Sequence, residues 1–222
     1  MTQVTSDKRH HAIMAARDVF WRNGYEEASM TELVEATGLN RYAIYSIFGS
    51  KRDLFLATLE SYFAHGEALF YPIINDTSRP ALERIEHGLY TMIELTLHQG
   101  QGCYICHVAV KESDRDQTVC AAVNEFFDRI LEAMSMPMRD AMEAGHLNPN
   151  LTPEMAARIV FAAEMSMGLY IQAAAPRETL QSIAHAAMAA ISAPGAWSPI
   201  DPPKIVLPEE MIASFPKAPV PN

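Results

Sequence analysis

Apolar residues recur at steps of three and four along nearly the whole chain, and no segment of any length shows the strict alternation of a β-strand. This spacing is typical of helices that bury one face against their neighbours. The sequence therefore predicts an all-α protein.

The first predicted helix runs from about Ser6 to Asn23, and Gly24 is suited to end it in a left-handed turn. One apolar stripe follows this helix and consists of Ala12, Ala16, Val19 and Phe20. Such a stripe is typical of a helix that packs on one face.

Two short helices around a glycine turn are predicted next. Ser29 and Glu32 form a capping box at the start of a helix over residues 30–37, and Gly38 ends it. Asn40 is a suitable N-cap for a second helix over residues 41–48. These lengths are typical of a helix-turn-helix, whose second helix can lie in the major groove of DNA.

A longer helix begins after Gly49, where Ser50 and Asp53 supply a start signal, and we interpret it as a connector between domains. Further helices are expected near residues 79–98, 103–112, 116–145, 153–174 and 177–191. We predict a helix-turn-helix domain over residues 1–50 and a helical ligand-binding and dimerisation domain over residues 51–192. Residues 193–222 contain eight of the fourteen prolines and predict an extended tail.

Composition places the chain among ordinary globular proteins, with 49% hydrophobic and 20% charged residues. The start has no signal-peptide pattern, and Arg158 and Glu164 interrupt the most apolar later stretch, so we expect a cytoplasmic protein without a membrane partner. The net charge of −10 argues against nucleic acid at first sight. Residues 1–60, however, contain seven basic and eight acidic residues, so the acidity belongs to the rest of the chain.

The second short helix contains side chains suited to DNA. Ile44, Ile47 and Phe48 have the spacing of an inward face. Arg41 can donate a bidentate pair to guanine, while Tyr42 and Ala43 can contact a base edge or a thymine methyl group. Tyr45 and Ser46 can reach phosphate oxygens, so this helix predicts both base reading and backbone contact.

Two further residues are expected to contact phosphates. Thr31 occupies the first turn of the preceding helix, and Lys51 occupies the first turn of the following one. Helix N-termini attract anions through their unpaired N–H groups, and hydroxyl and ammonium groups add donors there. We expect both residues to position the protein on DNA and not to specify sequence.

The segment NGYEEASMTELVEATGLNRYAIYSIFGSKRDLF resembles the N-terminal signature of the TetR family of transcriptional regulators. The matching positions include Gly24, Tyr25, Tyr45, Phe48, Ser50, Lys51 and Leu54. The chain departs from the usual pattern at Tyr42 and Ala43, where glycine and threonine are frequent, at Ile47, often aromatic, and at Gly49, often proline. The resemblance therefore does not indicate the operator sequence.

The resemblance implies a homodimer that binds double-stranded operator DNA, usually repressing transcription until a small-molecule effector changes the spacing of its two reading heads. It also implies a dimer interface formed by the last two helices, here residues 153–174 and 177–191, which are rich in small residues. Closure of the monomer core is the alternative use of these helices. Two recognition helices of a dimer must lie about 34 Å apart to reach successive major grooves.

Candidate pocket residues lie in the apolar helical stretches of the larger domain. A methionine-rich chain suits a pliable apolar pocket, although such a stripe also serves as plain core. The candidates are Tyr90, Met92, Glu94, His107, Phe126, Met134 and Glu164. They do not indicate a class of effector.

The segment GCYICH, residues 102–107, contains two of the three cysteines. It matches a haem-attachment motif formally, but haem attachment normally occurs outside the cytoplasm, and a thioredoxin-like site would need a neighbouring strand. A Gly-Cys pair at this place resembles a subset of TetR-like regulators that respond to oxidants or electrophiles. The resemblance points to Cys103 as a redox candidate, with Cys106 or Cys120 as a resolving partner, and an inert helical cysteine is the alternative.

Motifs for enzymatic catalysis, for a metal and for a cofactor are not found, so we expect a protein that is not an enzyme and has no cofactor. A rival interpretation is a TetR-like activator or a regulator that contacts protein partners and binds DNA weakly by itself. The nearly neutral first sixty residues favour that rival. A steep salt dependence of DNA affinity would count against it.

Overall fold

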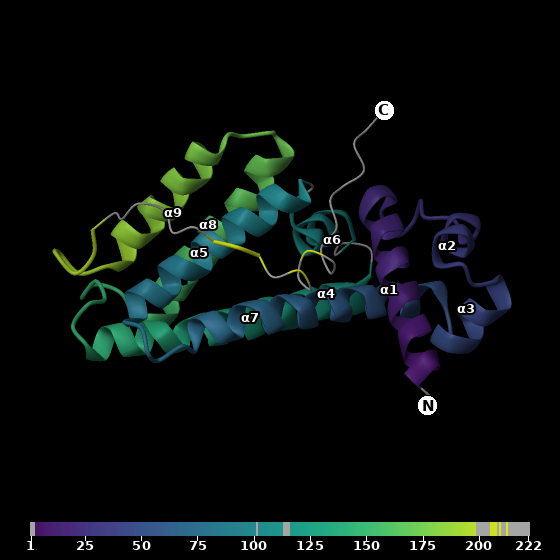
Figure 1. Ribbon diagram of the computed structural model, residues 1–222, viewed down its shortest axis with the longest axis horizontal. Coiled ribbons are helices and arrows are strands. Elements are labelled where there is room, and N and C mark those ends of the chain that lie inside the picture. The colour runs from purple at the N-terminus through teal and green to yellow at the C-terminus, as the bar shows by residue number, and fades with distance from the viewer. Residues whose placement is uncertain are drawn as a thin grey trace. The chain divides into compact units, whose positions relative to one another are not determined.

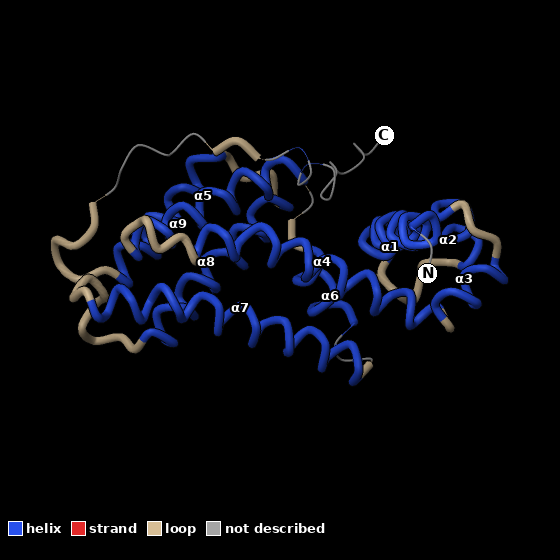
Figure 2. The backbone as a smooth tube through the Cα atoms, turned by 60° about the horizontal axis from the view of Figure 1, so that its bottom comes forward, coloured by secondary structure: helices blue, strands red, loops and turns tan. Residues whose placement is uncertain are grey.

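The computed structural model describes residues 3–100, 102–112, 116–198 and 205–207, together with Glu209 and Ile212 (Figure 1). Within these residues it contains nine α-helices and no β-strand, as the tube in Figure 2 shows. One isolated antiparallel bridge joins Leu147 to Ser192. The predicted all-α fold is confirmed.

The helices follow the predicted order, and their ends differ from the predicted ends by a few residues. They are α1 (Gln3–Asn23), α2 (Met30–Thr37), α3 (Arg41–Phe48), α4 (Lys51–Ile74), α5 (Ala81–Gln99), α6 (Tyr104–Glu112), α7 (Gln117–Glu143), α8 (Pro153–Gln172) and α9 (Arg177–Ile191).

The chain divides into two compact units. The first unit contains Met1–Gly66 and Tyr104–Phe126, and the second contains Glu67–Cys103 and Phe127–Asn222. The first unit thus combines α1, α2, α3 and the start of α4 with α6 and the start of α7. The functional division near residue 50 stays a prediction, because compactness alone does not assign DNA binding or ligand binding to a segment.

The core of the first unit forms where the stripe of α1 meets the helix-turn-helix and α4. All four stripe residues are buried, and Phe20 contacts Phe55 of α4 edge to face, with ring centroids 5.1 Å apart. Leu33 of α2 and Ile44 of α3 are completely buried. Burial of one such side chain contributes roughly 1.5–3 kcal/mol, so these residues hold the two short helices on α1.

The core of the second unit is built by α5, α8 and α9, which lie side by side (Figure 1). Small residues make this close approach possible, because Ala156, Ala157 and Ala184 are almost fully buried. Met138 and Ala141 of α7 join the same cluster.

The first residues of the C-terminal tail pack on the second unit. The Ala193 N–H donates to the His146 carbonyl at 2.8 Å, and Ala196 and Trp197 lie against the hydrophobic cluster. The prediction of an extended tail is wrong at Glu209 and Ile212, which have helical conformation. The seven residues after Pro208 contain no proline, and proline is well tolerated at the start of a helix.

In the part of the chain that the structure describes, no helix combines the length and the apolar character needed to cross a bilayer.

Candidate DNA-binding surface and sensing residues

The caps of the helix-turn-helix match the sequence prediction. Ser29 Oγ accepts the Glu32 N–H at 3.2 Å, and the Glu32 carboxylate accepts the Ser29 N–H at 2.8 Å. Gly38 adopts a left-handed φ of 67° at the end of α2. Asn40 Oδ1 accepts the Ala43 N–H at 2.8 Å and begins α3. These local bonds set the turn that aims α3.

Helix α3 has one completely buried side chain, Ile44, and exposes most of the others. Tyr42 is 82% exposed, which is unusual for a large aromatic residue. Tyr45 is 39% exposed, and the Arg41 guanidinium lies 5.8 Å from the centroid of its ring. Ser46 is exposed and Ala43 is half-buried. The predicted DNA-facing residues of α3 therefore share an accessible surface.

The predicted inward position of Ile47 is wrong, because this side chain is 40% exposed. Successive residues of an α-helix are about 100° apart, so Ile47 stands about 60° to one side of Ile44. Phe48, about 40° to the other side, is half-buried. Ile47 therefore stands at the border of the exposed face and presents an apolar side chain there.

The two predicted phosphate contacts lie beside α3 in sequence but differ in environment. Thr31 is exposed in the first turn of α2. Lys51 is half-buried, its Nζ lies 4.5 Å from the centroid of the Tyr25 ring, and it donates to the Glu26 carbonyl at 3.3 Å. An ammonium group has three donors, so these contacts hold Lys51 in place and leave donors for a phosphate.

Sequence reasoning missed Arg9 as a cation beside α3. Its guanidinium lies 5.3 Å from the centroid of the Phe48 ring, although the two residues are 39 positions apart. Only the packing of α1 on α3 brings them together, so no local pattern indicates the contact.

Polar contacts tie the start of α4 to α6 and α7 within the first unit. Arg52 donates to the Asp116 carboxylate at 2.6 Å and to the Thr118 hydroxyl. Glu112, which is 4% exposed, accepts the Tyr25 N–H at 3.0 Å. These bonds tie the segment before α2 and the start of α4 to the end of α6 and the start of α7.

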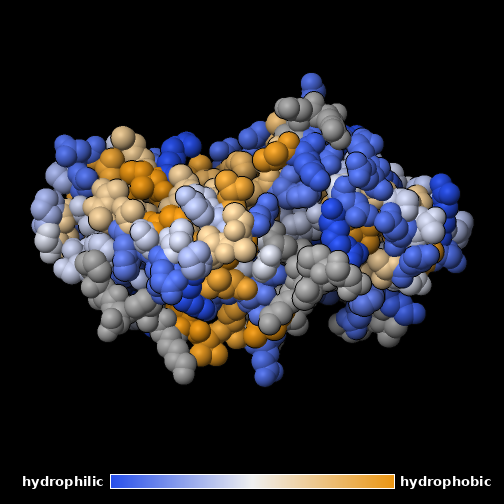
Figure 3. All heavy atoms as spheres, turned by 90° about the horizontal axis from the view of Figure 1, so that it is seen from above, coloured by the Kyte–Doolittle hydropathy of each residue, from blue (hydrophilic) through white to orange (hydrophobic). Residues whose placement is uncertain are grey.

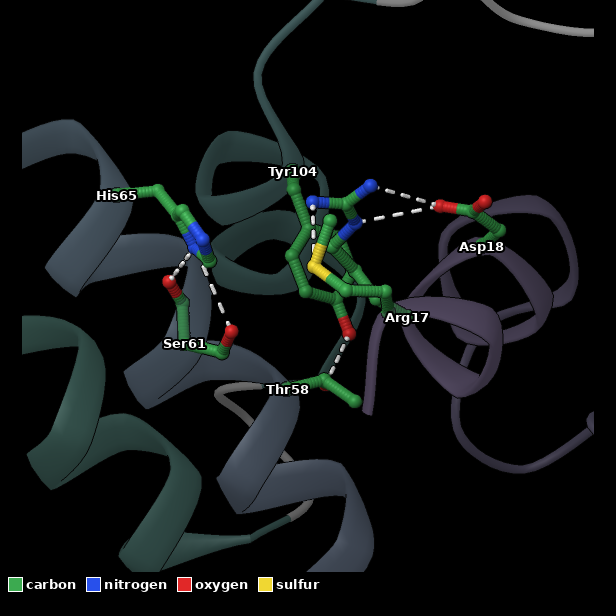
Figure 4. Close-up of polar contacts among 7 residues, drawn as sticks. Arg17, Asp18, Thr58, Ser61, His65 and Tyr104 are labelled. Atoms are coloured by element: carbon green, nitrogen blue, oxygen red, sulfur yellow. Dashed lines mark hydrogen bonds and ion pairs between the residues drawn. The ribbon is translucent and has the colours of Figure 1, made fainter. Parts of the chain in front are cut away.

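A buried polar cluster lies between α1, α4 and α6 (Figure 4). Arg17 is 1% exposed and pairs with Asp18 at 3.1 Å. Tyr104 is completely buried, and its hydroxyl lies 2.9 Å from Thr58 Oγ1. Burial raises the pKa of Tyr104, so its hydroxyl stays protonated. The sequence showed Tyr104 only as a residue between two cysteines and did not indicate this position.

The predicted pocket residues divide between the two units. Tyr90, 2% exposed, has its hydroxyl 2.7 Å from His185 Nε2. Glu94 forms an ion pair with Arg177 of α9. Met134 is partly buried against the hydrophobic cluster, and Met92 is half-buried. These four lie in the second unit, as Glu164 does.

The other two candidates, His107 and Phe126, belong to the first unit. Phe126 stacks on Phe63 with ring centroids 3.9 Å apart. His107 is half-buried, its Nε2 has no hydrogen-bond partner, and burial lowers its pKa. The seven candidates are therefore not gathered within either unit.

Cys103 and Glu164 form a neighbouring pair in the second unit. Glu164 is 6% exposed, and burial together with the nearby Cys103 thiol raises its pKa to about 8. Cys103 Cβ lies 3.4 Å from the position that a Cβ on Gly168 would occupy. Cys103 is half-buried, Cys106 lies in the first turn of α6, and neither is in a disulfide. A protonated Glu164 can donate a hydrogen bond to a polar group.

Side chains placed to hold a metal ion are not found among the described residues, where no group of three or more His, Cys, Asp or Glu converges.

The comparisons with known proteins agree with this architecture. The family described as "Bacterial regulatory proteins, tetR family" matches residues 12–58. The HTH-type transcriptional repressor DhaR of Mycobacterium sp. (strain GP1) is 23% identical over 172 residues, which are 78% of this chain and 86% of DhaR.

Two solved structures share the fold. A cysteine mutant of the TetR family transcriptional regulator CifR, complexed with 26-bp double-strand operator DNA, superposes with a TM-score of 0.73 at 23% identity over 82% of this chain and 95% of that chain. The reduced form of NemR from Escherichia coli superposes with a TM-score of 0.74 at 18% identity over 85% of this chain and 100% of that chain.

Proposed function

The chain is a DNA-binding transcriptional regulator of the TetR family, and we propose that it represses transcription as a homodimer that leaves a palindromic operator when a small molecule binds its second unit. The observation that carries the proposal is the exposed face of α3, where Arg41, Tyr42 and Tyr45 lie on the surface around a single buried anchor, Ile44. A regulator must share a compartment with its operator, so a cytoplasmic location is part of the proposal.

Base reading falls to the N-terminal half of α3. Arg41 is exposed at the first position of the helix, where a guanidinium can form two hydrogen bonds with guanine O6 and N7. Its proximity to the Tyr45 ring restricts the guanidinium before DNA arrives, which reduces the entropy lost on binding. Tyr42, 82% exposed, supplies a second contact to a base edge.

Phosphate contacts fall to Thr31, Tyr45, Ser46 and Lys51. Thr31 lies beside the N–H groups of the first turn of α2, where an anion is favoured. Lys51 is held in place by the Tyr25 ring, so it presents a fixed charge. These contacts supply affinity for any sequence, while α3 supplies the choice among sequences.

The dimer interface is proposed on the outer faces of α8 and α9. Leu169 is 68% exposed and Tyr170 is 46% exposed on α8. Several alanines are exposed beside them, namely Ala162, Ala173, Ala186, Ala189 and Ala190. In the left half of Figure 3, apolar side chains lie at the surface. Helices α8 and α9 lie on this side in Figure 1. A second copy of the chain would cover this surface with the same surface of its own.

One variant tests the dimer, with a control of similar exposure. We expect Leu169→Glu to shift the protein from dimer to monomer in sedimentation velocity at micromolar concentration, because it buries a charge in an apolar interface. Val110→Glu, on the 84% exposed residue of α6, should leave the dimer intact. Dimers of equal stability in both variants would remove α8 from the interface.

The effector is proposed to bind the second unit near Glu164, whose raised pKa keeps a hydrogen-bond donor in an apolar setting. Oxidation or alkylation at Cys103 is the alternative release signal, with Cys106 or Cys120 as resolving thiol. The two signals are separated by Cys103→Ser, which would abolish oxidant-driven release of operator DNA and preserve release by a small molecule.

Salt dependence of binding tests the DNA-binding function itself. A dimer that neutralises several phosphates should lose affinity steeply with salt, with a slope of about −0.9 per phosphate in a plot of log K against log salt. A shallow slope with weak binding would instead support the alternative, in which the helix-turn-helix contacts a protein partner.

A further inference from the structure

Helix α3 carries most of the large apolar side chains that the first unit exposes. Among the described residues of this unit, Tyr42, Tyr45 and Ile47 of α3 are exposed, and Val110 of α6 is the only other one. Single exposed apolar residues are normal on a protein surface, but three on one helix of eight residues indicate a contact surface. The two tyrosines also have hydroxyl groups that can bond to DNA, whereas Ile47 offers apolar contact alone.

Four of the residues of α3 form two edges around the buried anchor Ile44. Successive residues of an α-helix are about 100° apart, so Arg41 and Tyr45 lie about 60° and 100° to one side of Ile44. The contact between the Arg41 guanidinium and the Tyr45 ring, 5.8 Å from its centroid, agrees with this placement. Ala43 and Ile47 lie about 100° and 60° to the other side. Helix α3 therefore has a polar edge, Arg41 and Tyr45, and an apolar edge, Ala43 and Ile47.

The side chains of the apolar edge suit one feature of the major groove. Ile47 is 40% exposed and Ala43 is half-buried, and neither side chain can form a hydrogen bond. Guanine, adenine and cytosine present donors and acceptors in this groove, and an apolar side chain against them leaves those groups without a partner. Thymine adds a C5 methyl group, which an apolar side chain can cover without that loss. Thymine is therefore the base that fits the apolar edge.

We propose that Ile47 is a specificity-determining residue that packs on the C5 methyl group of a thymine in each operator half-site, and that Ala43 continues the same contact one turn earlier. Four residues of helix rise by about 6 Å, so the two side chains cover about two base-pair steps of about 3.4 Å each. Arg41, on the polar edge, reads guanine. The inference rests on the proposed function and deepens it, because it names the chemistry of the operator on each side of α3.

The proposed contact differs in kind from the proposed phosphate contacts. Ala43 and Ile47 carry no charge, so their contact with DNA releases no counterion. Lys51, in contrast, presents an ammonium group held by the Tyr25 ring. The apolar edge should therefore contribute to the choice among sequences and leave the salt dependence of binding unchanged.

Replacement of thymine by deoxyuridine tests the contact directly, because it removes the C5 methyl group and leaves the hydrogen-bonding groups of the base in place. The operator selected by the purified protein is synthesised with one thymine position at a time replaced in both half-sites. Burial of one methyl-sized group corresponds to about fourfold in affinity, so we expect a loss of about 15-fold for the two half-sites together at the contacted position. Other thymines should lose less than about twofold, because no side chain covers their methyl groups.

Ile47→Ala identifies the residue that makes this contact. The variant withdraws the side chain from the methyl group, so its affinities for the thymine and deoxyuridine duplexes should differ by less than about twofold at that position. Ile47→Val, which loses a single carbon, should give an intermediate ratio. Val110→Ala shortens an exposed branched residue of the same unit and should keep the parent ratio. Circular dichroism verifies that each variant is folded.

Three results would overturn the proposal. They are a selected half-site without thymine in either strand, a parent protein that binds every deoxyuridine duplex as tightly as the thymine duplex, and an Ile47→Ala variant that keeps the parent ratio. Each of them requires a selected operator, so each leaves the proposed function standing. A protein that selects no DNA sequence would instead overturn the proposed function and this inference with it.

Discussion

Tyr42 and Tyr90 illustrate the difference between the proposed DNA-contacting surface and the proposed sensing region. Tyr42 stands 82% exposed on α3, whereas Tyr90 is 2% exposed on α5 and bonds to His185. A residue proposed to contact DNA must face solvent before DNA arrives, so the pattern of one short amphipathic helix can suggest it. Tyr90, proposed as a sensing residue, is buried with a partner from a distant helix, and that partner decides its chemistry.

The same contrast applies to charge. Charged groups on the proposed DNA-binding surface, such as Arg41 and Lys51, keep contact with solvent or an aromatic ring. Glu164 lies buried on α8, where its charge is disfavoured. The proposed DNA-binding surface therefore offers charges that can contact an anion at once. The second unit, in contrast, contains a carboxyl group, Glu164, whose ionisation would lower the stability of the folded protein.

The largest expected effect is the pH dependence caused by Glu164. Its folded pKa, about 8, lies above the ordinary value of 4.5, so the folded state keeps a proton that the unfolded state loses. Its contribution to stability is therefore unchanged below about pH 4.5 and is lost progressively as the pH rises towards 8, at about 1.4 kcal/mol per pH unit. Glu164→Gln should remove this slope.

Urea unfolding of parent and Glu164→Gln between pH 5.5 and pH 7.5, at one protein concentration, measures that difference. Glu83→Gln, an exposed residue of the same unit, should keep the parent slope. Parallel stability curves for parent and Glu164→Gln would show that this carboxyl group is not desolvated.

The next effect sharpens the contrast within the second unit. Gly102 and Gly145 both have left-handed φ, 77° and 71°, but only Gly102 has backbone within 3 Å of a new Cβ. We expect Gly102→Ala to lose about 1–3 kcal/mol more stability than Gly145→Ala, because a backbone oxygen cannot move aside as a side chain can. Equal losses in thermal unfolding would mean that the 102–103 segment is not seated on α8.

On the reading surface, Arg41→Ala should cost about 1–3 kcal/mol at one operator position and relax the preference there. Lys51→Ala should weaken binding to all operator variants alike and lower the salt slope by about 1. Affinities for a set of operators with single base-pair changes separate the two outcomes. Uniform losses across the set for both variants would refute the assignment of Arg41.

The smallest effect concerns the cap that aims the turn. Ser29→Ala removes the side-chain acceptor of the Glu32 N–H, while the backbone half of the capping box stays possible, and it should destabilise the first unit by about 1 kcal/mol. Glu35→Ala, on an exposed residue of the same helix, serves as the control and should change thermal unfolding by less.

Local sequence signals predicted the first unit well because its elements are started and ended by neighbouring residues, as Ser29, Gly38 and Asn40 show. They failed at Ile47, which lies at the border of the buried stripe, where periodicity does not decide exposure. Glu164 could be selected as a polar residue in an apolar helix, but its pairing with Cys103 depends on the approach of Gly102 to α8. Tyr104 carried no sequence signal, since its partners Trp21 and Thr58 lie at least 46 positions away.

Selection of genomic DNA fragments by the purified protein tests the central claim most directly. The account predicts one enriched palindrome with half-sites spaced by about one helical turn or a multiple of it, and loss of that enrichment when Arg41 is replaced by alanine. The absence of any enriched sequence, or enrichment that does not depend on Arg41, would contradict operator reading by α3.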